Sequence, residues 1–245
     1  MYTKTKQILF QLVPKNFVLQ NEVWLRNVHY HLFHRGSNHE CSICEKKIKS
    51  FVVNKNHLIC PNCGSMQRNR RLWPLLKQEF IVEQITILDF SPSRVLFRKF
   101  KNIKNITYLS TDFENEFIAD YSFDITNIAL ESNSVDLIIC YHILEHIEND
   151  KKAMQELFRI LKNGGKALIQ TPFKTGEIYE DHSIITPQDR KQHFGQEDHV
   201  RFYSVAGLKN RLENEGFQVE IRKFEKEETY LGLEPNETIL ICEKA

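Results

Sequence analysis

Four of the six cysteines form two pairs whose spacing is typical of a metal site. Cys41 and Cys44 make one Cys-x-x-Cys pair, Cys60 and Cys63 make the other, and 15 residues separate the pairs. Each pair offers two thiolates from one tight turn, and a spacer of hairpin length brings the second turn opposite the first. Four thiolates complete a tetrahedral Zn²⁺ shell, so the sequence predicts a structural zinc site with no open position for catalysis.

Disulfides or buried free thiols are the alternatives for these cysteines. The first residues of the chain contain only a short apolar run, interrupted at positions 14–16, which does not resemble a secretory signal. No stretch approaches the roughly 20 apolar residues that cross a bilayer. We therefore expect a cytoplasmic protein, in which thiols stay reduced. Cys140 and Cys242 lie in apolar segments, where core packing is the default interpretation.

Three aspartates form a second group of candidate functional residues. Asp89, Asp112 and Asp124 stand at the ends of apolar segments that we predict as strands. In open α/β sheets, ligands bind beyond the carboxyl ends of the strands, so these acids could hold a polar ligand together. An aspartate after a strand also commonly caps the next helix, and this alternative stays open for each of the three.

Strand-like and helix-like segments alternate from residue 81 onward, which predicts a mostly parallel sheet flanked by helices. The pattern predicts helices that begin at Ser91-Pro92, near residue 151 and near residue 204. The last two strands have no crossover element between them and must form an antiparallel hairpin. The predicted strands are 86–90, 106–110, 119–123, 135–140, 166–171, 217–223 and 238–243.

The order of these elements resembles class I methyltransferases that use S-adenosylmethionine (SAM). The resemblance covers roughly residues 84–245 and is strongest in the blocks Asn133-Ser-Val-Asp-Leu-Ile-Ile-Cys-Tyr-His-Ile-Leu-Glu-His-Ile147 and Glu156-Leu-Phe-Arg-Ile-Leu-Lys-Asn-Gly-Gly165. It implies an α/β fold with a Rossmann-like, seven-stranded, mostly parallel sheet and an antiparallel last strand. The zinc-ribbon-like module, followed by Cys-Pro-Asn-Cys-Gly-Ser-Met-Gln-Arg-Asn-Arg-Arg, resembles a bacterial subgroup of the same family.

The resemblance implies roles for the residues at the strand ends. Asp112 would accept hydrogen bonds from the ribose hydroxyls of SAM, Asp124 would accept from the adenine amine, and Ile125 would flank the ring. Asp89 would face the methionine end of the cofactor. The first loop departs from the family because Asp89-Phe-Ser-Pro-Ser-Arg94 contains no glycine, so we expect the hydroxyl of Ser91 or Ser93 to replace backbone contacts.

The transferable methyl group should lie near the end of the fourth predicted strand, beside Cys140 and Tyr141. His142 follows directly and is the candidate general base, because a histidine can exchange a proton near neutral pH. Glu145 and His146 come one turn later, and the simplest expectation is that these polar side chains face outward.

Residues 172–203 form an insert that we predict to be a substrate lid, since it is dense in histidine, acidic, arginine and aromatic residues. Its candidate substrate-binding residues are Asp198, His199, Arg201 and Tyr203. A second metal set among His182, His193 and His199 fits no standard spacing.

These patterns divide the chain into four parts. We predict an N-terminal helical segment at 1–35, a zinc-binding module at 36–67, a connecting helix at 68–83 and the methyltransferase domain at 84–245. The net charge is +1, but residues 1–80 carry a balance of +9 and the remainder −8. This asymmetry suggests an anionic partner, such as RNA, at the N-terminal module, although bound thiolates would cancel part of the excess.

Two functions remain open. The first is a SAM-dependent methyltransferase that acts on an oxygen or nitrogen atom of a small molecule, a glycan intermediate or RNA. The arginines at 68, 70 and 71 favour RNA, whereas Cys-Tyr-His-Ile stands where base-methylating enzymes carry an Asn-Pro-Pro-Tyr-like motif. The second is a non-catalytic protein, in which a degenerate methyltransferase domain supports a zinc module that binds nucleic acid or protein.

Overall fold

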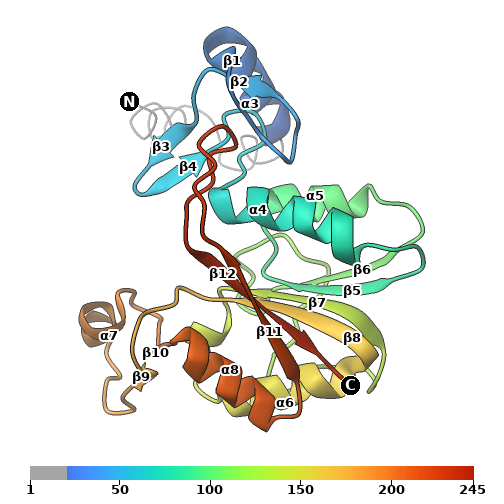
Figure 1. Ribbon diagram of the computed structural model, residues 1–245, viewed down its shortest axis with the longest axis vertical. Helices are drawn as coiled ribbons and strands as arrows, with labels where there is room; N and C mark the ends of the chain where they lie inside the picture. The colour runs from blue at the N-terminus through green and yellow to red at the C-terminus, as the bar shows by residue number, and fades with distance from the viewer. Residues whose placement is uncertain (1–20) are drawn as a thin grey trace. The chain divides into compact units, whose positions relative to one another are not determined.

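The computed structural model describes residues 21–245. The first 20 residues, which we compared with a secretory signal, lie outside this range. The described chain forms two compact units (Figure 1). The first unit extends to Ile81 and also contains 225–236, whereas the second contains 82–224 and 237–245. Among the described residues, no helix combines the length and apolar character needed to span a membrane.

Short elements make up the first unit. Helix α3 (Glu22–His29) continues as the π-helical turn η1 (Tyr30–His34), and β1 (Arg35–Glu40) pairs with β2 (Lys47–Ile48). The hairpin predicted between the cysteine pairs is present as β3 (Val52–Asn54) and β4 (His57–Ile59), with Lys55 at a φ of 52° in its turn. Helix α4 (Gln67–Leu75) and η2 (Leu76–Phe80) follow.

A buried arginine connects the loop 225–236 to the rest of the first unit. The Arg70 side chain is fully buried and donates hydrogen bonds to the carbonyl oxygens of Leu231 and Gly232, at 2.9 and 2.7 Å. It also donates to the carbonyls of Leu58 and Ser65. Because five guanidinium donors in a planar fork can satisfy several carbonyls at once, one side chain orders a loop about 160 positions away in the sequence.

A six-stranded sheet forms the second unit, in the order β11-β12-β8-β7-β5-β6. All its pairs are parallel except those of β12, which runs antiparallel to both β8 and β11. This confirms the Rossmann-like, mostly parallel sheet and the terminal antiparallel hairpin. The strands are β5 (Thr86–Phe90), β6 (Thr107–Thr111), β7 (Val135–Tyr141), β8 (Leu161–Gln170), β11 (Gln218–Phe224) and β12 (Glu237–Glu243).

The third of the seven predicted strands, at 119–123, is not a strand of the sheet, so this prediction was wrong. In this segment only Tyr121 makes a bridge, to Thr111 at the end of β6. The hydroxyl of Ser110 accepts from the amide of Asp120, and the hydroxyl of Thr111 accepts from the amide of Phe123. The amides of Asp120 and Tyr121 also both donate to the carbonyl of Ser110, so side-chain and backbone acceptors share these donors and no regular ladder forms.

Helices cover both faces of this sheet, with α5 (Arg94–Lys101) on one side and α6 (Asp150–Ile160) and α8 (Val205–Asn214) on the other (Figure 1). Ser93 caps α5 by accepting from the amide of Leu96, so the expectation that Ser91 caps this helix was wrong by two positions. The insert contains β9 (Tyr179–Glu180), α7 (Pro187–Phe194) and β10 (Arg201–Phe202), and β9 pairs with β10.

Candidate functional site

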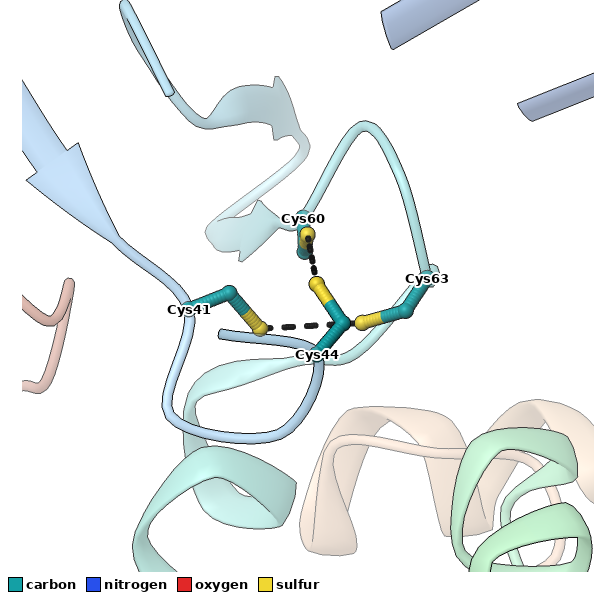
Figure 2. A group of neighbouring side chains, drawn as sticks. All are labelled: Cys41, Cys44, Cys60 and Cys63. Carbon is teal, nitrogen blue, oxygen red and sulfur yellow. Dashed lines mark hydrogen bonds between the residues drawn. The ribbon is translucent and has the colours of Figure 1, made fainter. Parts of the chain in front are cut away.

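The four paired cysteines converge on one point in the first unit (Figure 2). Their sulfur atoms all lie within 4.8 Å of one another, with 3.6 Å between Cys41 and Cys63 and 3.8 Å between Cys44 and Cys60. Zn–S bonds of about 2.3 Å in a tetrahedron place sulfur atoms about 3.8 Å apart. The donor set and its spacing therefore fit Zn²⁺, and the sulfurs are too far apart for disulfides.

Local backbone geometry explains this convergence. Cys41 and Cys60 each accept, through their carbonyls, from the amide four residues later. Those residues are Glu45 and Gly64, and both have a positive φ, of 57° and 80°. The two turns thus have the same backbone geometry, and each brings both of its thiols to the shared cluster. The hydroxyl of Ser65 lies 3.3 Å from the sulfur of Cys41, and the neighbouring thiols hold the pKa of Cys41 well below its ordinary value.

The arginines after the second cysteine pair do not form the exposed basic surface that the sequence suggested. Arg70 is fully buried, and Arg71 is 5% exposed. Arg71 donates to the carbonyl of Glu234 at 2.8 Å and lies 3.3 Å from the carboxylate of Glu228. These two guanidinium groups hold the 225–236 loop and offer no exposed charge to RNA, whereas Arg68 is half-buried and its prediction stays open.

The sheet register aligns the strand ends at which ligands were expected. Phe90 of β5 pairs with Thr111 of β6 and with Cys140 of β7, so the three carboxyl ends lie at the same edge. Ser91 and Asp112 follow these strands directly. The Ser91 hydroxyl donates to Oδ1 of Asp112 at 2.7 Å, which shows that the loop after β5 meets the acid after β6.

Ser91 adopts the backbone conformation that glycine favours. Its φ is 45°, in the left-handed region where a Cβ atom causes strain. The glycine-free loop therefore follows a glycine-like path despite its sequence. The large side chain of Phe90, which precedes Ser91, does not fill the loop, because it is buried in the core with Leu88 and Ile138.

The carboxylate of Asp112 is buried and well supplied with donors. Oδ1 accepts from Ser91, and Oδ2 accepts from the amides of Glu116 and Phe117 at 2.6 and 3.0 Å. A carboxylate has about four acceptor positions, so three donors leave about one for a further ligand. Two further donors, such as the hydroxyl groups of a diol, would require one present donor, most simply the Ser91 hydroxyl, to turn away.

Asp124 and Ile125 follow the irregular segment after β6. Oδ1 of Asp124 accepts from both the amide and the hydroxyl of Thr126 at 2.8 Å, which leaves Oδ2 for another donor. Ile125 is 4% exposed and packs in the core cluster. Asp124 is thus placed as a partly exposed acceptor, whereas Ile125 serves the core.

Asp89 lies within β5 rather than beyond its end, and its carboxyl group is buried. Tyr108 of β6 donates its hydroxyl to Oδ2 of Asp89 at 2.9 Å, and the Tyr108 ring stacks on Phe100 of α5. Burial raises the pKa of Asp89 to about 7, against the opposing effect of the Tyr108 hydrogen bond. Asp89 therefore changes charge near neutral pH inside the fold.

The end of β7 carries the candidate base. Cys140 is 1% exposed, and burial raises the pKa of its thiol, so it packs in the core, while Tyr141 is half-buried. His142 has a φ of 57°, and its Nδ1 lies 3.3 Å from Oε1 of Glu145. Burial opposes ionisation of Glu145, but the contact with His142 holds its pKa below the ordinary value. The expectation that Glu145 faces outward was wrong, since it is 1% exposed.

The four substrate-binding candidates of the insert divide into two pairs. Arg201 and Tyr203 are buried, and their polar atoms bond to protein groups, Arg201 to Glu180 at 2.7 Å and Tyr203 to Asp150 at 2.5 Å. These contacts hold the insert in place. Asp198 is exposed and bonds to Nδ1 of His146 at 3.1 Å, and His199 is buried beside His146 with ring centroids 4.6 Å apart.

His182 and His193 do not join His199. Instead, Glu145 and His146 approach it and form a second group of possible metal ligands. The sequence could have indicated this group only through the adjacent Glu145 and His146. His199 follows His146 by 53 positions, so spacing alone could not predict that it lies beside them.

Comparisons with known proteins identify the family and the fold. A family model described as a methyltransferase domain matches residues 43–220. A curated relative, the ubiquinone biosynthesis O-methyltransferase of Rickettsia typhi, is 25% identical over 159 residues, which are 64% of this chain and 58% of that protein. The chain spans less than two thirds of the length of the curated relatives that it matches.

Solved structures show the same fold. A SAM-dependent methyltransferase from Archaeoglobus fulgidus superposes with a TM-score of 0.51 at 18% identity, over 72% of this chain and 91% of that one. A SAM-dependent methyltransferase from Mesorhizobium loti gives a TM-score of 0.51 at 16% identity, over 70% and 96% of the two chains. With the family match across most of its length, the chain belongs to the class I SAM-dependent methyltransferase domains.

Proposed function

We propose that the protein transfers a methyl group from SAM to an oxygen or nitrogen atom of a polar substrate. The observation that carries this proposal is the contact between Ser91 and Asp112 at the aligned ends of β5 and β6. This contact brings a glycine-like turn and an acid together where the family holds the adenosine group. Membership of the methyltransferase family supports the same proposal.

Several residues at this edge would hold the cofactor. Asp112 would accept from the ribose hydroxyls after Ser91 turns away, and Asp124 would accept from the adenine amine through Oδ2. Ile125 and Cys140 would support the adenine and methionine sides from the core, and Tyr141 would lie closest to the sulfonium. Asp89 would act from beneath the loop through the hydrogen bond from Tyr108.

SAM supplies an electrophilic methyl group on a sulfonium, and transfer forms a bond from oxygen or nitrogen to carbon as the carbon–sulfur electron pair returns to sulfur. The acceptor must lose a proton. His142 is the residue that would take it, because Glu145 contacts its Nδ1 and stabilises the imidazolium that results. The positive φ of His142 is consistent with a residue held in place for function.

The insert would bind the substrate through Asp198 and His199, while Arg201 and Tyr203 hold its shape. The zinc cluster would be structural, because four thiolates leave no open coordination position. A cytoplasmic location belongs to the same proposal, since a four-thiolate site requires reduced cysteines. The argument for an RNA substrate now rests mainly on the charge asymmetry of the chain. The proposed substrate is a small polar molecule, a glycan intermediate or RNA.

Calorimetry with SAM and with its demethylated product tests this proposal. We expect binding by the full chain and a loss of at least tenfold in affinity in Asp112→Ala. Asp136→Ala is the matched control, because Asp136 also accepts a backbone amide, that of Thr86, but at the start of β7. Equal loss in both variants, or no binding by the unmodified protein, would contradict the proposal.

A non-catalytic role is the second candidate. The observation that favours it is the occupancy of Asp112 by three protein donors. If the Ser91 hydroxyl and the two amides do not yield to ribose, the fold persists without cofactor binding. Absence of SAM binding in the unmodified protein, together with a stable fold, would favour this candidate.

A further inference from the structure

Three side chains from two distant segments converge beside the end of β7. Glu145 and His146 lie on the short helix η3 (Leu144–His146), and His199 precedes β10. Each offers one ligand atom, and these atoms all lie within 4.8 Å of one another. The cluster shares no residue with the four cysteines and lies entirely within the second unit.

Burial with few well-formed hydrogen bonds distinguishes this cluster from an ordinary surface group. Glu145 is 1% exposed and His199 is 2% exposed. Among the described residues, neither carboxylate oxygen of Glu145 and neither ring nitrogen of His199 has a well-formed hydrogen bond. A buried polar group without a partner costs about 1–3 kcal/mol, and more if it is charged, so native structures rarely keep several of them together.

The surrounding contacts hold the cluster in a fixed arrangement. The amide of Val200 donates to the carbonyl of Glu145 at 2.9 Å, which joins the two segments directly. The buried Arg201 donates to the carbonyls of Leu144, Ile147 and Glu148 around η3. These bonds satisfy the backbone of both segments and leave the three ligand side chains directed at one another.

Two flanking residues supply the supporting contacts that metal ligands commonly have. Asp198 lies 3.1 Å from Nδ1 of His146, and a carboxylate in this position orients a metal-bound histidine and raises its basicity. His142 lies 3.3 Å from Oε1 of Glu145 and would hold the carboxylate from the other side.

We propose that Glu145, His146 and His199 bind a divalent transition-metal ion. Two imidazoles and one carboxylate suit Zn²⁺, Mn²⁺ or Fe²⁺ better than Ca²⁺ or Mg²⁺, which prefer oxygen ligands. Three protein ligands leave open positions, in contrast to the closed shell of the four cysteines. The ion itself would fulfil the hydrogen-bonding capacity of Glu145 and His199 that the protein leaves unused.

The use of this ion rests on the proposed methyl transfer. The proposed ion site lies next to His142, the candidate base. An open coordination position of the ion would bind the acceptor oxygen of a hydroxyl-bearing substrate and favour the loss of its proton. The hydroxyl proton would pass to His142 and the oxygen would bond to the methyl carbon as the carbon–sulfur pair returns to sulfur. This narrows the substrate class to acceptors with a hydroxyl group.

Titration with Mn²⁺ of the full chain carrying one equivalent of zinc, which the four thiolates take first, tests the site when followed by electron paramagnetic resonance. Thiolates select zinc strongly over manganese, so the four-cysteine site will not compete for the probe. We expect one Mn²⁺ to bind per chain, and we expect Glu145→Gln, which keeps the size of the side chain, to lower the affinity at least tenfold. His182→Ala removes an exposed histidine of the same insert and should bind Mn²⁺ as the unmodified chain does.

His199→Ala provides a second variant, with circular dichroism to verify that both variants keep the fold. Absence of bound Mn²⁺ in the unmodified chain, or equal affinity in Glu145→Gln and the unmodified chain, would overturn the ion site. Calorimetry with SAM on the same samples separates the two proposals. Mn²⁺ binding without SAM binding would reject the methyl transfer alone, whereas SAM binding without Mn²⁺ binding would reject the ion alone.

Discussion

The hydroxyl of Ser91 donates to Oδ1 of Asp112 at 2.7 Å, and this bond joins the loop after β5 to the end of β6. Ser91 holds a φ of 45° while making it. The same bond both assembles the candidate cofactor site and occupies part of the acceptor capacity that a ribose would use. With Asp112 holding the ribose as proposed, substitutions at Ser91 should change the affinity for SAM.

Ser91→Gly should bind SAM severalfold more tightly than the unmodified protein. Glycine lacks the hydroxyl and so frees one acceptor position on Asp112, and it relieves left-handed backbone strain of about 1–3 kcal/mol, which raises stability. Isothermal calorimetry measures the affinity and urea unfolding measures the stability. Ser91→Ala separates the two effects, because it removes the hydroxyl but retains the strain. Weaker binding in Ser91→Gly would show that the hydroxyl helps to hold the cofactor.

Asp89 should make stability fall as pH rises toward neutrality. Its folded pKa of about 7 exceeds the unfolded value of about 4, so its favourable contribution is complete below about pH 4 and is lost as pH rises through about 7. Asp89→Asn stays neutral, and its hydrogen bond with Tyr108 can persist. The variant should gain a few kcal/mol over the unmodified protein between pH 4 and pH 8. Urea unfolding across this range measures the difference, and a constant difference would reject the raised pKa.

Removal of the metal from the four cysteines should unfold the first unit. Structural zinc contributes on the order of 10 kcal/mol to the folding of small modules, which is more than their own cores supply. Cys44→Ser should reduce the zinc content below one ion per chain and increase proteolysis within 36–67. Cys242→Ala is the control, because Cys242 is buried in β12 and should leave the zinc content unchanged. Full zinc content in Cys44→Ser would contradict the assignment.

Arg70→Ala should destabilise the first unit by more than about 3 kcal/mol, since the change leaves four carbonyl groups without their donor. Limited proteolysis should then cut within 225–236. Lys46→Ala, an exposed change in the same unit, is the control and should leave the cleavage pattern unaltered. Equal resistance of the Arg70 variant would show that other contacts hold the loop.

His142→Gln should lower the rate of methyl transfer by about 10²–10⁴ while leaving SAM affinity within about twofold, because a general base acts on the acceptor and not on the cofactor. Single-turnover transfer from labelled SAM, with an acceptor found by screening, measures the rate. Since His142 also contacts Glu145, the metal content of the variant should be measured in parallel. An unchanged rate would remove His142 from the role of base.

Features that depend on local geometry could be predicted from the residue pattern alone. Two Cys-x-x-Cys turns predicted the converging thiols, and alternating apolar segments predicted the parallel sheet with its antiparallel hairpin. Strand ends in a parallel sheet meet at one edge, so the shared edge of Asp112 and the Ser91 loop also followed from the order of the elements, whereas their hydrogen bond did not.

The inward direction of several polar side chains could not be predicted, because it depends on contacts between distant segments. A residue pattern records neither the direction of Arg70 nor the burial of Arg201, because both depend on carbonyls that distant segments present. The same holds for Glu145 and His199, which docking of the insert brings together across more than 50 positions. Side-chain oxygens from β6 likewise prevented the expected third strand, a competition that strand propensity does not contain.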